Sequence, residues 1–239
     1  MSFCILGTGM AVPKTVLTND AISAMVDTTD EWIFSRTGIR ERRVCTDETM
    51  TSLAADAAQR ALENADTKAE ELDLIICGTF RGDYVFPSQA CLIQKEIGAD
   101  CPAFDVNAAC PGFLYGLDVA AGYFARKKAK KILVVGMDVI SRSVDWQDRA
   151  TCVLFGDGGG AVVLGEGDGL LASRITASGN AAMGMPVAEA YAEFKTLENQ
   201  VFIKSDTVRS GGTVQDGFNP YKTTSKVLIR RFFKKKFKK

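Results

Sequence analysis

Two continuous apolar runs, each too short for a buried helix, constrain the fold of this chain most strongly. "LDLIICGTF" at 72–80 and "KILVVGMDVI" at 131–140 are apolar on both faces, which is typical of strands covered by helices above and below. Helical patterns alternate with these runs at 50–65, at 88–98, where Gly98 is expected to end the helix, and at 110–128. The last is apolar nearly all round and is therefore expected to be buried. The alternation predicts an α/β protein with helices on each side of a sheet.

Local signals place further elements. "SFCILGTGMAVP" predicts a short strand followed by a glycine turn that Pro13 stops, and "AFDV" and "LLASRITASG" predict two more strands. "TTDEWIFSRTG" predicts a helix that Thr28 caps, Glu31 closes through a capping box and Gly38 ends in the left-handed conformation. A further helix is expected around "PVAEAYAEFKTL", within 180–221.

The glycine-rich stretch "CVLFGDGGGAVVLG" predicts two strands joined at an Asp-Gly turn. A phosphate-binding loop is not expected there, because the stretch lacks G-K-[ST] and continues into a strand-like run instead of a helix.

Composition excludes several classes of protein. Apolar residues make up 46% of the 239, enough for a buried core. The seven cysteines form no C-x-x-C pair and the chain has no histidine, which argues against a disulfide framework and a metal site and favours buried reduced thiols. No apolar run is long enough to span a membrane, and no Lys or Arg precedes Lys14 as a secretory signal requires. We therefore expect a cytoplasmic protein.

Charge is divided unevenly along the chain. Nine of the 29 Lys and Arg residues lie at 222–239 without any Asp or Glu, which leaves 20 basic against 29 acidic residues before them. We expect three parts: an ordered part at 1–165, a weakly patterned remainder at 166–221, and a disordered basic tail at 222–239. The tail permits nonspecific attraction to nucleic acid or an anionic membrane, although a solvated tail is the commoner case.

Cys110 lies in "FDVNAACPGFLYGLDV", between a strand-like and a helix-like run. Pro111 suits the first position of a helix, which would place Cys110 at or near the N-cap, where the helix dipole favours a thiolate nucleophile. The alternative is an inert core thiol, since free cysteine is among the most buried residue types.

Four motifs occur in order: "DTTDEWIFSRTGIRERR", "FPSQACLIQKEIG", "DVNAACPGF" and "DRATCVLFGDGGGAVVLG". Together they resemble β-ketoacyl-acyl carrier protein synthase III, a thiolase-fold condensing enzyme, over roughly residues 1–165. The resemblance implies the N-terminal half of a thiolase-like fold, a mixed sheet covered by helices. It also implies that Cys110 takes an acyl group from acyl-coenzyme A and passes it to malonyl-acyl carrier protein, with coenzyme A thioester as substrate and no cofactor.

The resemblance implies further site residues. Trp32, Arg36 and Arg149 would hold the nucleotide end of coenzyme A, although a cation over an exposed aromatic ring is common without any ligand. Phe155 would line the acyl tunnel, or be an ordinary core residue. Phe86 would close the acyl pocket of the partner in a homodimer, or simply pack before Pro87.

The same resemblance assigns a histidine and an asparagine to the second half of the fold, which we expect to be missing or replaced here. Condensation is therefore expected to be impaired. Two alternatives stay open: a non-catalytic coenzyme A-binding or assembly subunit, and another Cys-His-Asn synthase of the same fold, such as a hydroxymethylglutaryl- or polyketide-forming type. No specific nucleic-acid partner is expected.

Overall fold

The computed structural model describes residues 2–175 and 200–203, all within one compact unit, Met1–Arg209. The helices are α1 (Asn19–Ser23), α2 (Asp30–Thr37), α3 (Met50–Asn64), η1 (Ala69–Glu71), α4 (Gln89–Ile97), α5 (Gly112–Ala125), η2 (Ile140–Arg142) and α6 (Arg149–Cys152). The strands are β1 (Ser2–Ala11), β2 (Val16–Thr18), β3 (Glu41–Arg43), β4 (Leu74–Gly78), β5 (Ala103–Val106), β6 (Lys131–Val139), β7 (Asp157–Gly167), β8 (Leu170–Arg174) and β9 (Gln200–Ile203).

A five-stranded mixed sheet in the order β1-β7-β6-β4-β5 organises this unit. β7 runs antiparallel to β1 and β6, whereas β6, β4 and β5 are parallel to one another. Two smaller sheets pair β2 with β3 and β8 with β9. Every residue of β4 is buried, which confirms the prediction that this apolar run is a strand covered on both faces.

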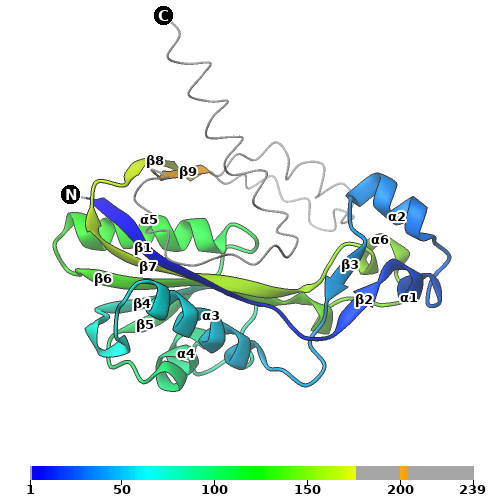
Figure 1. Cartoon of the computed structure of the whole chain (residues 1–239), viewed down its shortest axis with the longest axis horizontal. Helices are drawn as coiled ribbons and strands as arrows, with labels where there is room; N and C mark the ends of the chain where they lie inside the picture. The colour runs from blue at the N-terminus through cyan, green and yellow to red at the C-terminus, as the bar shows by residue number, and fades with distance from the viewer. Residues whose placement is uncertain (1, 176–199, 204–239) are drawn as a thin grey trace, which may run out of the picture. The chain divides into compact units, whose positions relative to one another are not determined.

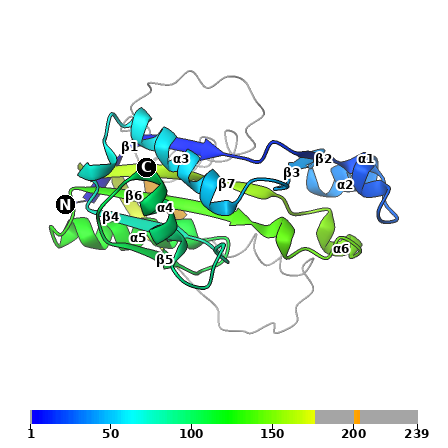
Figure 2. The same ribbon diagram turned by 90° about the horizontal axis from the view of Figure 1, so that it is seen from below.

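Helices cover the two faces of the sheet, with α3 and α4 on one side and α5 on the other (Figures 1 and 2). Side chains of a strand alternate between its faces, and β4 shows the consequence. Ile75 and Cys77 join the core beneath α3 and α4, whereas Leu74 and Ile76 join the core beneath α5. The predicted α/β arrangement is therefore confirmed for the described residues.

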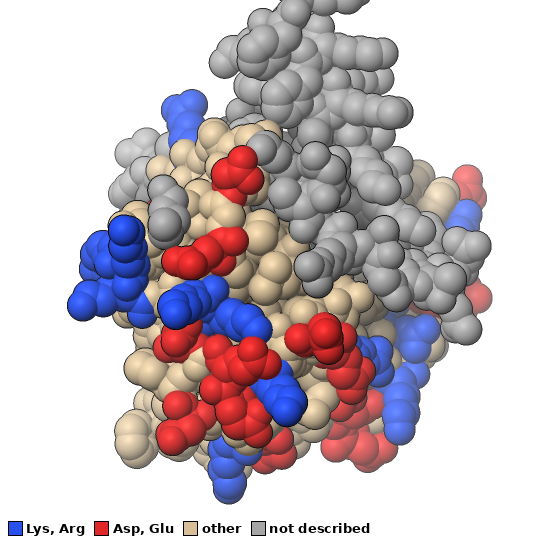
Figure 3. Space-filling model, turned by 60° about the vertical axis from the view of Figure 1, so that its left-hand side comes forward, with Lys and Arg blue, Asp and Glu red and all other residues tan. Residues whose placement is uncertain are grey.

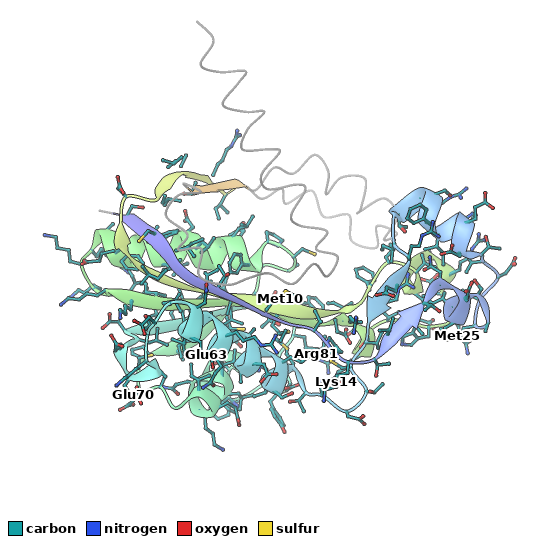
Figure 4. All side chains as sticks on the ribbon, in the orientation of Figure 1. Met10, Lys14, Met25, Glu63, Glu70 and Arg81 are labelled. Atoms are coloured by element: carbon teal, nitrogen blue, oxygen red, sulfur yellow. The ribbon has the colours of Figure 1, made fainter. Side chains whose placement is uncertain are left out.

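Beyond one end of the sheet lies a group of short elements, α1, α2, β2 and β3 (residues 16–43) together with α6, which we call the end lobe (Figure 1). It has a small core of its own made of Ile22, Ile33, Cys152 and Val153. In Figure 4, Met25 marks this lobe, far from Glu63 and Glu70 of the helical layer. The lobe thus stands apart from the main core and places its side chains past the end of the strands.

Two predictions about the glycine-rich segments are wrong. β1 is one strand from Ser2 to Ala11, so the expected glycine turn does not form. Asp157–Gly167 is likewise one strand, β7, and not a hairpin. The long ladder with β1 and β6 on both sides overrides the local Asp-Gly signal. A Cβ at Gly159 would lie 2.3 Å from the carbonyl oxygen of Gly136, so close strand approach is what requires glycine there.

The helix ends were predicted in part. Gly38 ends α2 in the left-handed conformation, as expected. Gly98 ends α4 at the expected residue and also adopts the left-handed conformation. The N-cap of α2 is Thr29 and not Thr28, and its hydroxyl accepts a hydrogen bond from the Trp32 N–H. The expected capping box with Glu31 is not formed. Two adjacent threonines carry the same local signal, and only the tertiary path of the chain selects one of them.

Burial also departs from the sequence pattern in two places. α5 was expected to be buried nearly all round, but only one face is buried, and Asp118, Gly122 and Ala125 are exposed. The cysteines were expected to be mostly buried, yet only Cys77, Cys101 and Cys152 are. All seven are free thiols.

The predicted boundary at residue 165 falls inside β7. The helix expected within 180–221 and the basic tail at 222–239 lie outside the described residues. On the face seen in Figure 3, acidic and basic side chains of the described residues are interspersed, the usual composition of a solvated surface.

Candidate active site

Cys110 lies in the short loop between β5 and α5, and its side chain is exposed. α5 begins at Gly112 with Pro111 at the N-cap, so the thiol precedes the helix by one position more than predicted. Ala109 has a φ of 49°, in the left-handed region, and its carbonyl accepts a hydrogen bond from the Gly112 N–H at 2.8 Å. This tight turn presents the cysteine to solvent instead of to the core.

The first turn of α5 is seated directly on the sheet. A Cβ at Gly78, the last residue of β4, would lie 2.5 Å from the carbonyl carbon of Gly112 and 2.6 Å from the N of Phe113. A Cβ at Gly116 would lie 2.9 Å from Val134 of β6. Small residues at these contacts therefore fix the height of the helix above the strands, and with it the position of Cys110.

The carboxyl ends of the three parallel strands are tied together beside this loop. Asp138 of β6 accepts hydrogen bonds from the Thr79 hydroxyl at 2.9 Å and the Phe80 N–H at 2.8 Å. Asn107 of the cysteine loop donates to the Phe80 carbonyl at 3.1 Å. Burial raises the pKa of the Asp138 carboxyl, and the two hydrogen bonds offset part of that rise.

Asp138 and Asn107 did not enter the sequence prediction. A signal for Asp138 exists, because a single carboxylate in a strand that is otherwise apolar on both faces must find hydrogen-bond partners inside the protein. Its partners lie 58 and 59 residues away, however, so the sequence could not identify them.

The loop between β4 and α4 is anchored by a second polar network. Asp83 accepts hydrogen bonds from the N–H and the hydroxyl of Thr51, at 2.8 and 2.7 Å, and pairs with Arg142. Buried Gln89 accepts from the Asp83 N–H at 3.0 Å. Burial acts to raise the pKa of Asp83, but the hydrogen bonds from Thr51 and the ion pair with Arg142 outweigh it, so this pKa lies below its ordinary value.

The anchored loop carries exposed apolar side chains. Phe86 is 88% exposed, and Phe80, Tyr84 and Val85 are exposed beside it in sequence. The interpretation of Phe86 as a residue that merely packs before Pro87 is therefore wrong for the described residues. Its proposed contact with a partner chain stays a prediction. Phe155, between α6 and β7, is half-buried, and its role in an acyl tunnel also stays a prediction.

Trp32 is the centre of a cationic cluster in the end lobe. The Arg36 guanidinium carbon lies 4.3 Å from the centre of the indole ring, and that of Arg149 lies 4.1 Å from it. Arg36 comes from the same helix one turn later, whereas Arg149 comes from α6, 117 positions away in the sequence. The structure thus brings together the three residues expected to bind a nucleotide. The Arg149 Nε is buried without a hydrogen-bond partner among the described residues.

The cysteine loop and α6, which carries Arg149, both follow the carboxyl ends of strands in the sheet. β6 continues through η2 into α6 at its carboxyl end (Figure 1). β5 is parallel to β4 and therefore to β6, and it leads into the cysteine loop at the corresponding end. The carboxyl edge of a parallel sheet is the usual location of ligand sites in α/β proteins.

Another thiol, Cys45, borders a cleft of about 410 Å³ that Met25, Trp146 and Arg142 also line. Burial, followed by the charge of Asp157, raises the pKa of Cys45 to about 12. It therefore remains a neutral thiol near pH 7 and is a poor nucleophile. Exposed Cys110 is the better candidate.

The described residues contain no group of three or more His, Cys, Asp or Glu side chains placed to hold a metal ion. Within the same residues, no helix has the length and apolar character needed to cross a membrane.

Solved structures with the same fold define the class of this protein. The synthase III of Aquifex aeolicus matches with a TM-score of 0.76 and 45% identity, over 81% of this chain and 67% of that one. The priming β-ketosynthase of the R1128 polyketide pathway matches with a TM-score of 0.68 and 30% identity, over 85% and 64%. The fold is the thiolase-like fold of condensing enzymes, here with an exposed cysteine at the carboxyl edge of the sheet.

Sequence comparison identifies the family. The family model of 3-oxoacyl-[acyl-carrier-protein] synthase III matches residues 104–179. The β-ketoacyl-[acyl-carrier-protein] synthase III of Xanthomonas euvesicatoria is 53% identical over 180 residues, 74% of this chain and 55% of that protein. That of Vesicomyosocius okutanii is 48% identical over 189 residues, 78% and 60%. The chain belongs to the 3-oxoacyl-[acyl-carrier-protein] synthase III family, and it spans little more than half the length of these curated relatives.

Proposed function

We propose that this chain is an acyltransferase of the condensing-enzyme type, in which Cys110 accepts an acyl group from acyl-coenzyme A. The exposure of its thiol at the carboxyl edge of the sheet carries the proposal. The thiolate sulfur attacks the thioester carbonyl, a new carbon–sulfur bond forms, and the bond to coenzyme A breaks, so that coenzyme A leaves as a thiolate and takes up a proton. The 239 residues contain no histidine, so no imidazole of this chain acts as the base.

The cluster around Trp32 supports coenzyme A as the donor. An indole ring offers a flat surface on which a purine stacks, and a guanidinium binds phosphate through paired N–H groups. Arg36 and Arg149 place two such cations at one ring. In this proposal, Phe155 and the Phe86 of a second copy border the acyl group.

The test is incubation with acetyl-coenzyme A followed by intact-mass measurement of the protein. We expect a gain of one acetyl group that is absent from Cys110→Ser. Acetylation that persists in Cys110→Ser would refute the assignment. Trp32→Ala should weaken coenzyme A binding about tenfold, because a cation–π or stacking contact contributes about 1–2 kcal/mol. Binding without acylation would instead favour a non-catalytic coenzyme A-binding subunit, which the lack of histidine would allow.

The second substrate in this proposal is malonyl-acyl carrier protein, because the family is named for a reaction on acyl carrier protein. The resemblance assigns decarboxylation and condensation to a histidine and an asparagine, and the sequence holds no histidine. We expect Cys110 to be acylated without measurable formation of a 3-oxoacyl product. A condensation rate above the rate of Cys110→Ala would contradict this expectation.

The exposed loop supports a homodimer. Val85 and Phe86 are exposed on a loop that the Asp83 network holds in place, and β5 is an edge strand of the five-stranded sheet. Exposed apolar side chains and an unpaired edge favour association with a second copy. Light scattering should show a dimer, and Val85→Ser should shift it toward monomer, whereas Val16→Ser, at another exposed valine, should not. Monomeric unaltered protein would refute this part of the proposal.

A further inference from the structure

A buried arginine in β3 connects three parts of the end lobe. Arg42 is only 6% exposed. Its Nη1 donates to the Asn19 Oδ1 at 2.8 Å and to the Leu17 carbonyl at 3.3 Å, and its Nη2 donates to the Val153 carbonyl at 2.9 Å. Val153 is the C-cap of α6. The guanidinium therefore joins the end of α6 to β2 and to the first residue of α1.

Asn19 continues this path to α2. Its side chain is 1% exposed, and its Nδ2 donates to the Asp30 Oδ1 at 2.8 Å and to the Ile39 carbonyl at 2.7 Å. Asp30 is the first residue of α2 and also pairs with Arg40. The amide thus uses its acceptor on Arg42 and both of its donors on the segment that carries α2.

The result is a continuous hydrogen-bonded path from α6 to α2 through two buried side chains. α6 carries Arg149 and α2 carries Trp32, the two residues that meet at 4.1 Å. Since neither helix is longer than eight residues, neither has much rigidity of its own. The separation of Trp32 and Arg149 therefore depends on the residues that join their helices. These are the apolar core of Ile33, Cys152 and Val153 and the path through Arg42 and Asn19.

Burying the Arg42 guanidinium costs free energy that a purely stabilising contact would not require. Burial lowers the pKa of Arg42, and its hydrogen bonds go to neutral acceptors; its Nε has no partner among the described residues. Apolar side chains of similar volume often stabilise a protein at least as well as a buried charge. A planar guanidinium with fixed N–H directions specifies geometry, which apolar packing does not.

We propose that Asn19 and Arg42 are positioning residues that set the spacing of Trp32 and Arg149 and thereby the affinity for the nucleotide end of coenzyme A. This inference rests on the proposed function of the Trp32 cluster. The two residues act through the helices that they join, and their side-chain hydrogen bonds go to Leu17, Asp30, Ile39 and Val153 and to each other, not to Cys110. Their loss should weaken the binding of substrates that carry the nucleotide and spare those that lack it.

The experiment compares Asn19→Asp with Asn64→Asp. An aspartate at 19 retains the acceptor for Arg42 but cannot donate to Asp30 and repels it. Asn64 accepts a hydrogen bond from the Thr8 N–H at 2.9 Å, and an aspartate there retains that contact, so it is the matched control. The readouts are the Kd for adenosine 3′,5′-bisphosphate by calorimetry and the acylation rate of the protein with acetyl-coenzyme A and with acetyl-N-acetylcysteamine, which has no nucleotide.

For Asn19→Asp we expect a Kd for the bisphosphate raised about tenfold, the scale of one hydrogen bond to a charged group. The rate of acylation by acetyl-coenzyme A at subsaturating concentration should fall by a similar factor. The rate of acylation by acetyl-N-acetylcysteamine should stay within about twofold of that of the unaltered protein. For Asn64→Asp, the Kd and both acylation rates should stay within the same limit. Loss of a residue with only a structural role would lower the acylation rates with both thioesters by the same factor.

Asp30→Ala provides a second variant if Asn19→Asp does not fold, because its partly exposed side chain can be removed without leaving a buried cavity. It should likewise lower the acylation rate with acetyl-coenzyme A relative to the rate with acetyl-N-acetylcysteamine. Unchanged bisphosphate binding in folded Asn19→Asp or Asp30→Ala would refute the positioning role and leave the proposed function standing. If the unaltered protein binds neither the bisphosphate nor coenzyme A, both the proposed function and this inference are wrong.

Discussion

Replacement of Gly78 by alanine tests how α5 and Cys110 are held on the sheet. The new Cβ would lie 2.5 Å from the carbonyl carbon of Gly112 and 2.6 Å from the N of Phe113. Both are backbone atoms in the first turn of α5, so no side-chain rotation can relieve the overlap. The helix must move away from β4, or β4 must move within a sheet that is buried on both faces.

Two opposing effects set the magnitude. Alanine in a strand is favoured over glycine by about 0.5–1 kcal/mol, because glycine loses more conformational freedom on folding. Overpacking a close-fitting core costs about 1–3 kcal/mol, and contacts with backbone atoms belong at the upper end of that range. We therefore expect Gly78→Ala to lower the free energy of unfolding by about 2 kcal/mol, a large part of the 5–15 kcal/mol typical of a native protein.

Gly122→Ala is the matched control. Gly122 lies on the exposed face of α5, and a Cβ there would meet nothing within 4 Å. Alanine should stabilise the helix by up to about 1 kcal/mol. Urea unfolding followed by circular dichroism measures both variants, and thiol labelling in native buffer reports whether the Cys110 loop has moved. If Gly78→Ala unfolds at the same urea concentration as the unaltered protein, the close contact between Gly78 and the first turn of α5 does not hold the helix in place.

Three further outcomes are expected. The folded pKa of Asp83 lies below its unfolded value of 3.8, so the stability that ionised Asp83 contributes is present above that pH and is lost as the pH falls through the folded pKa. In Asp83→Asn, the free energy of unfolding should therefore fall less steeply with decreasing pH in acid. Burial raises the pKa of Cys45 from 9.0 to about 12, so stability present below pH 9 is lost as the pH rises toward 12, and Cys45→Ala should reduce that loss in alkaline melting curves. A thiol reagent should modify one cysteine fastest under native conditions, and Cys110→Ser should remove that phase; an unchanged fast phase would assign it to another thiol.

Much of the fold could be predicted from local patterns. The apolar runs at 74–78 and 131–139 are strands, and Gly38 and Gly98 end their helices. These features depend on residues a few positions apart, so their physical causes are contained in short stretches of sequence. The motif around Cys110 likewise indicated a turn between a strand and a helix, with the helix start misplaced by one residue.

The glycine-rich strands show where local information fails. The Asp157-Gly158 pair favours a hairpin when considered alone, yet it lies in a strand paired with residues 2–11 on one side and 131–139 on the other. Hydrogen bonds along both edges outweigh the preference of two residues for a turn. The partners in residues 2–11 are about 150 residues away in the sequence, so they leave no mark in the stretch itself.

For the site, the sequence by itself placed Cys110 at a turn between a strand and a helix, and Trp32 and Arg36 one helical turn apart. It left open whether the thiol is exposed or buried, which the structure decided. Tertiary structure decided that Arg149 reaches the same indole ring, that Asp138 ties the strand ends beside Cys110, and that Arg42 and Asn19 join α6 to α2. The physical reason is that a hydrogen bond or cation–π contact requires a separation of a few ångströms. For residues that are from 11 to 117 positions apart in the sequence, only the packed sheet and end lobe can provide that separation.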